Sequence, residues 1–376
     1  MTSAQRMKQE NEKRILQAVW ENPGIYRKLV AKKTNLSSQA VTNQVNELVQ
    51  KNLLLEYSQK TTGKGRAPIS LALNYKGIYL LTVDVSLNHM NVFLHNLDGD
   101  IVISAMLHLT GKEDSLQCLK DLIKRVLDQA GDEYLIQAIV ISVAGVVKED
   151  ARIVVSAEKI HWQDMDLVSA LEYLNIPVIV RNDVNFIAAY ERQHYPEDIS
   201  FMIVKLDIGI GASFVLNSSS LKTTSKVAGE LGHVSIAHPD TRPCICGKNN
   251  CLTKFISVEA LEKEYGASYN TIIEDVKKGE KRAIRLIEQI CDYLAPVLAN
   301  VINLLDIDRG ILCGCTMENF SHIIYPVLEK KIKENLSYWV SFKGLEIHKD
   351  TDMIKAGCQV WMEYLFTSED TSLIAE

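Results

Sequence analysis

The sequence predicts an α/β protein in two parts, a small basic domain of helices with a hairpin and a larger body of two α/β lobes. Three observations support this fold class. Helical and hairpin patterns fill the first 73 residues, and two strand-rich series that end in helices follow. Charge divides the chain at the same point: residues 1–73 hold 12 Lys or Arg and five Asp or Glu, a net charge of +7, whereas the whole chain carries −6. We therefore expect one domain over 1–75 and another over 76–376.

The composition argues against several protein classes. No run of 18 apolar residues is present, so we expect no membrane span. The N-terminal segment is charged and lacks the apolar core of a secretion signal. Most of the eight cysteines stand in apolar surroundings, which favours reduced thiols and a cytoplasmic location. A basic domain on an acidic body suggests that the head binds a polyanion, although a solvated basic surface is the alternative.

The first two helices of the head follow from apolar spacing. Apolar side chains of 9–21 form one helical stripe, and Asn22–Gly24 end that helix. In the next helix, Leu29, Val30 and Ala31 mark the expected buried side. This second helix is the expected first helix of a helix-turn-helix.

The third helix carries the predicted recognition surface. A tight turn spans 35–37, and Ser37 is a good N-cap. The expected inward side chains are Val41, Val45, Leu48 and Val49. The expected outward side chains are Ser38, Gln39, Thr42, Asn43 and Asn46. The outward set is short, polar and uncharged, so it can form hydrogen bonds with base edges in a major groove.

A hairpin completes the head. The alternating runs LLLEYSQ and PISLALN flank KTTGKGRAP, whose glycines let the backbone approach a phosphate and whose charges are Lys60, Lys64 and Arg66. This order of elements is that of a winged helix-turn-helix. We predict that Ser38, Gln39, Thr42 and Asn43 contact bases while Lys64 and Arg66 contact the DNA backbone or minor groove. A small protein-interaction module is the alternative.

The body begins at Tyr75 with three strands, two of them joined by the turn LDGD. We expect a helix at about 113–130, a strand in LIQAIVISVAGVV, a connecting stretch through HWQDMDLVSALEYL and a strand in PVIVRNDVN. The second series begins with FMIVKLDIGIGASFVLN, followed by helices at about 258–265, 269–277 and 280–305 and a strand in RGILCG. Two such halves imply two lobes with a cleft between them.

The segment GELGHVSIAHPDTRPCICGKNNC concentrates possible metal ligands. Cys244, Cys246 and Cys251 can supply three thiolates, and either His233 or His238 can supply a fourth ligand. Three Cys and one His make a closed tetrahedral zinc site, which is structural because no position remains for water. A redox pair is a weaker interpretation because the spacing is not Cys-x-x-Cys, and chance clustering is the remaining alternative.

The same segment, extended to GELGHVSIAHPDTRPCICGKNNCLTKFIS, closely resembles the signature of the ROK family of repressors, open reading frames and sugar kinases. RNDVNFIAAYE resembles the segment that carries the Asn-Asp pair of that family. The winged helix in front resembles the repressor branch, of the xylose-repressor type. The resemblance covers nearly the whole chain and implies the actin-like, ribonuclease-H-like, two-lobed sugar kinase fold.

The resemblance also implies roles for individual residues. It selects His233 over His238 as the ligand of one structural Zn²⁺ per chain, held in the loop 233–251. It also implies that Asn182, Asp183, Glu230 and His233 line the sugar-binding site. Considered alone, Asp183 is also a candidate N-cap of the helix from Val184. Thr253 stands where the family usually has a sugar-binding glutamate, so the preferred sugar or its affinity is expected to differ.

The nucleotide loops depart from the kinase pattern that the resemblance implies. Ser86, Leu87 and Asn88 stand where the family has Gly-Gly-Thr after Asp84. In DIGIGAS, Asp207 and Ile208 replace Gly-Thr, and in LCGCTMENF, Cys315 replaces a second glycine. Side chains and a carboxylate therefore occupy positions where ATP phosphates need glycine amides. We expect no enzymatic activity and assign no catalytic residue.

These patterns predict a sugar-responsive transcriptional repressor of carbohydrate-utilisation genes. Its expected partners are a palindromic operator DNA and a small sugar effector, and two half-sites require a homo-oligomer, either dimer or tetramer. A sugar kinase with a DNA-binding head is the main alternative. A scaffold that docks to a transport or signalling protein is another.

Overall fold

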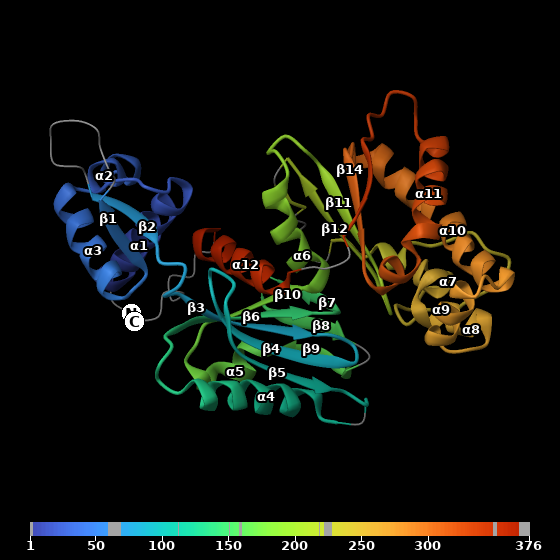
Figure 1. The fold of residues 1–376 in the computed structure, drawn as a ribbon, viewed down its shortest axis with the longest axis horizontal. Coiled ribbons are helices and arrows are strands. Elements are labelled where there is room, and N and C mark those ends of the chain that lie inside the picture. Colours follow the sequence, from blue (N-terminus) through green and yellow to red (C-terminus); the bar gives the residue numbers. More distant parts are fainter. Residues whose placement is uncertain are drawn as a thin grey trace. The chain divides into compact units, whose positions relative to one another are not determined.

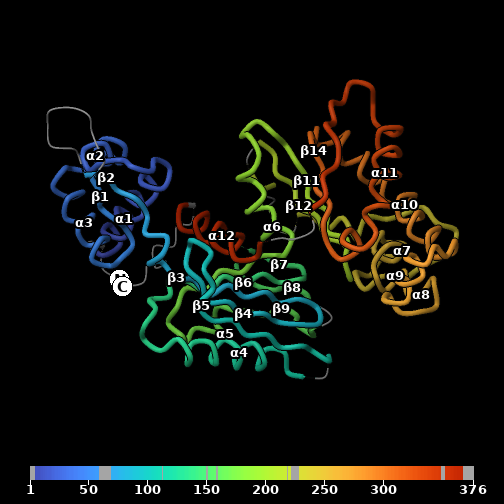
Figure 2. Tube along the Cα trace, viewed as in Figure 1, coloured from blue at the N-terminus to red at the C-terminus, as the bar shows by residue number. Residues whose placement is uncertain are grey.

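The computed structural model describes residues 3–58, 69–111, 113–149, 151–157, 160–217, 219–221, 228–348 and 352–367. The chain divides into two compact units. One comprises Met1–Arg181 together with Met353–Glu376, and the other comprises Asn182–Asp352. Figures 1 and 2 show the elements of each unit, coloured along the sequence. In the part of the chain that the structure describes, no helix is long and apolar enough to cross a membrane.

The N-terminal head is a three-helix fold with a two-stranded hairpin. Its elements are α1 (Ser3–Glu21), α2 (Arg27–Thr34), α3 (Ser38–Gln50), β1 (Leu54–Ser58) and β2 (Ile69–Leu73). The predicted turn before α3 is confirmed, because Asn35 has a φ of 55° and the Ser37 hydroxyl accepts a hydrogen bond from the Ala40 amide. The segment between β1 and β2, which holds Lys60, Lys64 and Arg66, lies outside the described residues.

The core of the head follows the predicted helical stripes except at Leu29, while Val49, which was predicted to face inward, is half-buried. Buried apolar side chains include Ile15, Val19, Val30, Ala31, Val41, Val45 and Leu48. The placement of Leu29 on the buried side was wrong, since its side chain is 37% exposed. Helix α2 has only eight residues and buries the narrow face of Val30, Ala31 and Thr34, which leaves Leu29 outside it.

The first α/β lobe contains a five-stranded sheet. Its strands are β3 (Tyr79–Val85), β4 (His89–Asn96), β5 (Ile101–His108), β6 (Ile136–Val143) and β10 (Val178–Asn182), in the order β10-β6-β3-β4-β5. β3 to β5 pair antiparallel, and β6 pairs parallel to β3. Helix α4 (Ser115–Ala130) packs against β4 and β5 with its apolar face. The α/β prediction is confirmed for this lobe.

A small second sheet forms in a region where the sequence predicted only the end of the strand in LIQAIVISVAGVV and a connecting stretch. Strands β7 (Val146–Lys148), β8 (Ile153–Ala157) and β9 (Trp162–Asp166) form it in the order β7-β8-β9, and α5 (Leu167–Leu171) follows. The run LIQAIVISVAGVV therefore contains β6 and the first two residues of β7. Short strands without alternating polarity carry little periodic pattern, and their pairing is decided by tertiary packing.

The second unit contains another five-stranded sheet with helices. Its strands are β11 (Phe201–Leu206), β12 (Ile210–Leu216), β13 (Ser219–Ser220), β14 (Arg309–Cys313) and β15 (Gly344–Ile347), in the order β13-β12-β11-β14-β15. Its helices are α6 (Asp183–Glu191), α7 (Thr253–Ile256), α8 (Val258–Tyr265), α9 (Tyr269–Lys277), α10 (Lys281–Leu305) and α11 (Cys315–Asn335). The predicted ranges of α8 and α9 are confirmed, and that of α10 differs by one residue.

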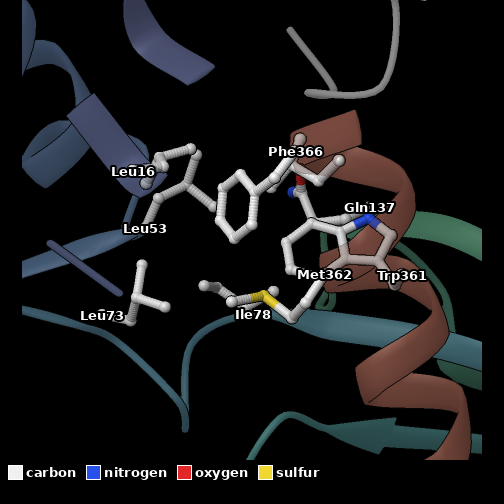
Figure 3. Close-up of a pocket in the computed structure, with 9 residues that line it drawn as sticks. Leu16, Leu53, Leu73, Ile78, Gln137, Trp361, Met362 and Phe366 are labelled. Atoms are coloured by element: carbon white, nitrogen blue, oxygen red, sulfur yellow. The ribbon is translucent and has the colours of Figure 1, made fainter. Parts of the chain in front are cut away.

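The last helix returns to the first unit. α12 (Met353–Thr367) packs on β3 and β6 and contacts α1 of the head. The Phe366 ring stacks on Trp20 with 5.0 Å between centroids. Figure 3 shows Trp361, Met362 and Phe366 from α12 beside a small cavity that Leu16 also lines. The head and the C-terminal helix thus share an apolar contact within one unit.

Candidate functional site

The predicted recognition surface is the exposed face of α3. Ser38, Gln39 and Asn43 are exposed, and Thr42 is partly exposed. The Gln39 amide donates to Asn43 Oδ1 at 3.0 Å, and the Thr42 hydroxyl donates to the Ser38 carbonyl at 2.8 Å. The four side chains therefore form one contiguous polar surface along the first turns of α3, with donors and acceptors that bases can engage.

Arg27 is a residue of this surface that the sequence analysis missed. Its guanidinium donates to the Thr42 carbonyl at 2.9 Å, to Asn46 Oδ1 at 2.6 Å and to Glu56 Oε1 at 3.0 and 2.8 Å. It thereby connects α2, α3 and the strand β1. A single arginine in a basic domain has no distinctive sequence pattern, so only the fold identifies this role.

The four predicted metal ligands come together. One potential ligand atom from each of His233, Cys244, Cys246 and Cys251 lies within 4.8 Å of all the others. His233 Nδ1 is 3.5 Å from Cys244 Sγ, and Cys246 Sγ is 3.5 Å from Cys251 Sγ. Ligand atoms around a tetrahedral zinc ion lie about 3.5–3.8 Å apart. The donor set therefore forms a cluster that could bind a metal.

The loop around the cluster has its own backbone support. The Cys244 amide donates to the Lys248 carbonyl, and the Gly247 amide donates back to the Cys244 carbonyl. Ser235 and Cys251 form an isolated β-bridge. His238, the alternative ligand, instead accepts a hydrogen bond from the Asp240 amide and packs on Phe255. The backbone contacts support the loop that carries the cysteines, and His238 has partners outside the cluster.

Burial and neighbouring groups shift the pKa values of the cluster residues. Burial, with the neighbouring thiols, raises the pKa of Cys251 to about 12. Burial lowers the pKa of His233, and the Lys248 ammonium lowers it further, which favours the neutral imidazole that metal ligation requires. A divalent cation would compensate for thiolates that are otherwise costly to form in this buried position.

His233 connects the cluster to the predicted sugar residues. Its Nδ1 faces the thiols, whereas its Nε2 lies 3.9 Å from Glu230 Oε2. Burial raises the pKa of Glu230, and the charge of Asp183 raises it further, so Glu230 and Asp183 belong to one electrostatic neighbourhood. A metal ligand that also faces a carboxylate is held in one orientation from both sides.

The N-cap of the helix after β10 is Asn182 and not Asp183, which the sequence offered as a candidate. Asn182 is the N-cap of α6, and its Oδ1 accepts hydrogen bonds from the Val184 and Asn185 amides. Asp183 is the first helical residue, and its Oδ2 accepts a hydrogen bond from Lys205 Nζ at 2.8 Å. The cap and the charged group are thus neighbouring residues with separate roles.

The segments 84–91 and 207–211 form tight connections between strands. Asp84 Oδ2 accepts hydrogen bonds from the Ser86 hydroxyl at 3.2 Å and the Asn91 amide at 3.5 Å. Asp207 Oδ1 accepts from the Ile208 amide at 2.8 Å and from the Cys315 thiol at 3.1 Å. Both aspartates are therefore engaged by nearby donors within their own units.

Comparison with known proteins assigns both parts of the chain. The profile of the ROK family matches residues 80–354, and that of winged helix-turn-helix DNA-binding domains matches residues 8–54. The chain is 27% identical over 330 residues to a protein named xylose repressor from Bacillus subtilis (strain 168), covering 85% of each. It is 24% identical over 351 residues to the DNA-binding transcriptional dual regulator NagC of Escherichia coli (strain K12), covering 87% of this chain and 85% of NagC.

Solved structures share the fold. A ROK family transcriptional regulator, described as a homologue of the E. coli MLC protein, superposes with a TM-score of 0.80 at 22% identity, covering 98% of this chain and 99% of the other. A ROK hexokinase from Thermus thermophilus superposes with a TM-score of 0.60 at 18% identity, covering 75% of this chain and 97% of the other. The family profile spans most of the sequence and includes the His/Cys cluster; this chain belongs to the ROK family.

Proposed function

We propose that this protein is a sugar-responsive transcriptional repressor of carbohydrate-utilisation genes. The observation that carries the proposal is the presence, in one chain, of a winged helix-turn-helix and a ROK domain, an arrangement shared with relatives named xylose repressor and NagC. In this proposal residues 1–75 bind DNA and residues 76–376 bind the effector.

The DNA-binding part uses the exposed face of α3. Ser38, Gln39, Thr42 and Asn43 contact bases, and Lys64 and Arg66 contact the backbone or minor groove. The polar, uncharged character of the α3 face and the basic character of the head support this assignment. The operator is palindromic and is bound by a homo-oligomer.

The effector-binding part uses Asn182, Asp183, Glu230 and His233. One Zn²⁺ per chain is held by His233, Cys244, Cys246 and Cys251. The metal fixes the orientation of His233 and so preorganises the sugar site. The distances within the cluster and the position of His233 between the thiols and Glu230 support this role.

The regulatory response follows from linkage. A sugar that binds one conformational state more tightly shifts the chain toward that state. The factor by which the sugar changes operator affinity equals the factor by which the operator changes sugar affinity. In the proposed direction the sugar releases the operator.

We further propose that the protein is not an enzyme. The relatives named xylose repressor and NagC support this, and side chains at Ser86, Asp207 and Cys315 stand where the family resemblance implies glycine in a kinase. The kinase alternative draws support from the Asp183 carboxylate, which could act as a base for a sugar hydroxyl. A coupled assay with hexoses, pentoses and ATP distinguishes the two, since measurable turnover would contradict the repressor-only assignment.

Fluorescence anisotropy tests the main proposal. The probe is labelled DNA from upstream of the gene and its neighbours, in the presence of excess unrelated DNA and a panel of sugars. We expect sequence-specific binding that one sugar reverses, and weaker binding by Arg66→Ala. Weak binding without sequence preference would favour the protein-partner scaffold instead.

A further inference from the structure

Lys205 occupies an unusual position in the second unit. β11 is the central strand of its sheet, and the other five residues of the strand, Phe201 to Val204 and Leu206, are buried and apolar. A lysine in such a strand breaks the local pattern and costs desolvation unless it is paired. Violations of this kind are expected at functional positions.

Two carboxylates from different segments meet the Lys205 ammonium. Its Nζ lies 2.8 Å from Asp183 Oδ2 at the start of α6 and 3.7 Å from Asp207 Oδ2 in the turn between β11 and β12. The side chains of Lys205, Asp183 and Asp207 are 22%, 14% and 29% exposed, so the group is accessible to a small ligand. We call these three residues the 183–205–207 triad.

The triad has more negative than positive charge. One ammonium faces two carboxylates, those of Asp183 and Asp207. The charge of Lys205 is therefore already compensated, and an anion that approaches the triad meets net repulsion. An uncharged hydroxyl meets no such repulsion, since it can donate to a carboxylate and accept from the ammonium.

Asp207 is held in the orientation that this arrangement needs. The Ile208 amide and the Cys315 thiol both donate to its Oδ1, which leaves Oδ2 directed at Lys205. The position of the ammonium is thus determined from both sides by elements of one unit.

We propose that Lys205 is a specificity-determining residue of the effector site: with Asp183 it forms a fixed donor–acceptor pair for sugar hydroxyls, and the net negative charge of the triad rejects phosphorylated sugars. The inference rests on the proposed role of Asp183 in sugar binding. The effector class is accordingly a free, uncharged sugar.

Isothermal titration calorimetry on the full-length protein tests this inference. The probes are D-xylose, D-glucose and N-acetylglucosamine, each compared with its terminal phosphate ester. We expect the phosphate ester of the sugar that binds to bind at least about tenfold more weakly than the free sugar. Lys205→Met should weaken binding of the free sugar by about tenfold or more, because it removes a hydrogen-bond donor and leaves two carboxylates without their common partner.

A second variant, Asp207→Asn, tests the charge of the triad through the ratio of phosphate-ester to free-sugar affinity. It brings the triad from a net charge of −1 to 0 while Lys205 remains paired with Asp183. We expect the ratio of phosphate-ester to free-sugar affinity to rise several-fold, a change that a general loss of structure at the site would not produce. The matched control is Lys343→Met, which removes a lysine paired at 3.2 Å with Asp308 elsewhere in the same unit and should change neither affinity.

The outcomes separate the inference from the proposed function. If a phosphate ester binds more tightly than its free sugar, if Lys205→Met leaves the free-sugar affinity unchanged, or if Asp207→Asn leaves the affinity ratio unchanged, the role of Lys205 is wrong while sugar sensing stands. If no probe binds and none affects operator binding, sugar sensing by this site and the inference fail together.

Discussion

Arg27 offers a direct test of how the recognition helix is held. Its guanidinium makes four hydrogen bonds, two to Glu56 and one each to the Thr42 carbonyl and Asn46. The side chains of Arg27 and Glu56 are 24% and 31% exposed, so solvent screening limits their ion pair to about 1 kcal/mol. The two bonds to α3 contribute about 1–2 kcal/mol more. Arg27→Ala should therefore lower the free energy of opening α3 from the rest of the head by about 2–3 kcal/mol.

Native-state hydrogen exchange of the full-length protein measures this effect. A loss of about 2 kcal/mol corresponds to roughly 30-fold faster exchange of protected α3 amides. Arg27→Lys should give an intermediate result, because an ammonium cannot reproduce the planar fork. Lys32→Ala in the same helix changes an exposed residue and should leave the exchange unaltered. Unchanged α3 protection in Arg27→Ala would refute the assignment of Arg27 as the residue that holds α3.

Three further predictions concern the second unit. Cys251→Ser should reduce zinc, measured by elemental analysis of protein purified without chelator, from one ion per chain to well below one; a wild-type protein without stoichiometric metal would contradict the zinc site. The hydrogen bond to Glu191 raises the pKa of His348 in the folded protein. The protonated His348 therefore stabilises the fold fully below the unfolded-state pKa near 6.5, and this stabilisation is lost as pH rises through the folded-state pKa. Thermal melts from pH 5.5 to 8.5 should show this decline, and Glu191→Gln should flatten it. Gly314→Ala should destabilise the protein by about 2–4 kcal/mol, because φ is +94° there and an added Cβ would lie 2.5 Å from the Leu206 carbonyl oxygen; a change below 0.5 kcal/mol in urea denaturation would show that the backbone relaxes.

The fold class and the DNA-binding head could be predicted because their patterns are local. A helical stripe, the polar face of α3 and the Ser37 cap each involve residues within a few positions of one another. The three cysteines likewise lie close together in the sequence, so their capacity to share a metal follows from spacing.

The partners of charged side chains could not be predicted in this way. The spacing left both His233 and His238 open as the fourth ligand, and the family resemblance selected His233. The loop geometry agrees, since it places His233 beside the thiols, whereas His238 accepts a hydrogen bond from the Asp240 amide. Asn182 and Asp183 are adjacent, yet one caps α6 and the other pairs with Lys205. These choices depend on distances between segments that the sequence separates.

The sequence by itself determined the class of the protein: the order of the secondary-structure elements, the basic head on an acidic body and the set of possible metal donors. Only the tertiary structure decided that the short strands β7, β8 and β9 pair, that α12 returns to the first unit, and that Lys205 lies between Asp183 and Asp207. The physical reason is one of range. Periodicity and capping act over a few residues, whereas side-chain packing and charge pairing act through space between segments whose approach is fixed by the folded chain as a whole.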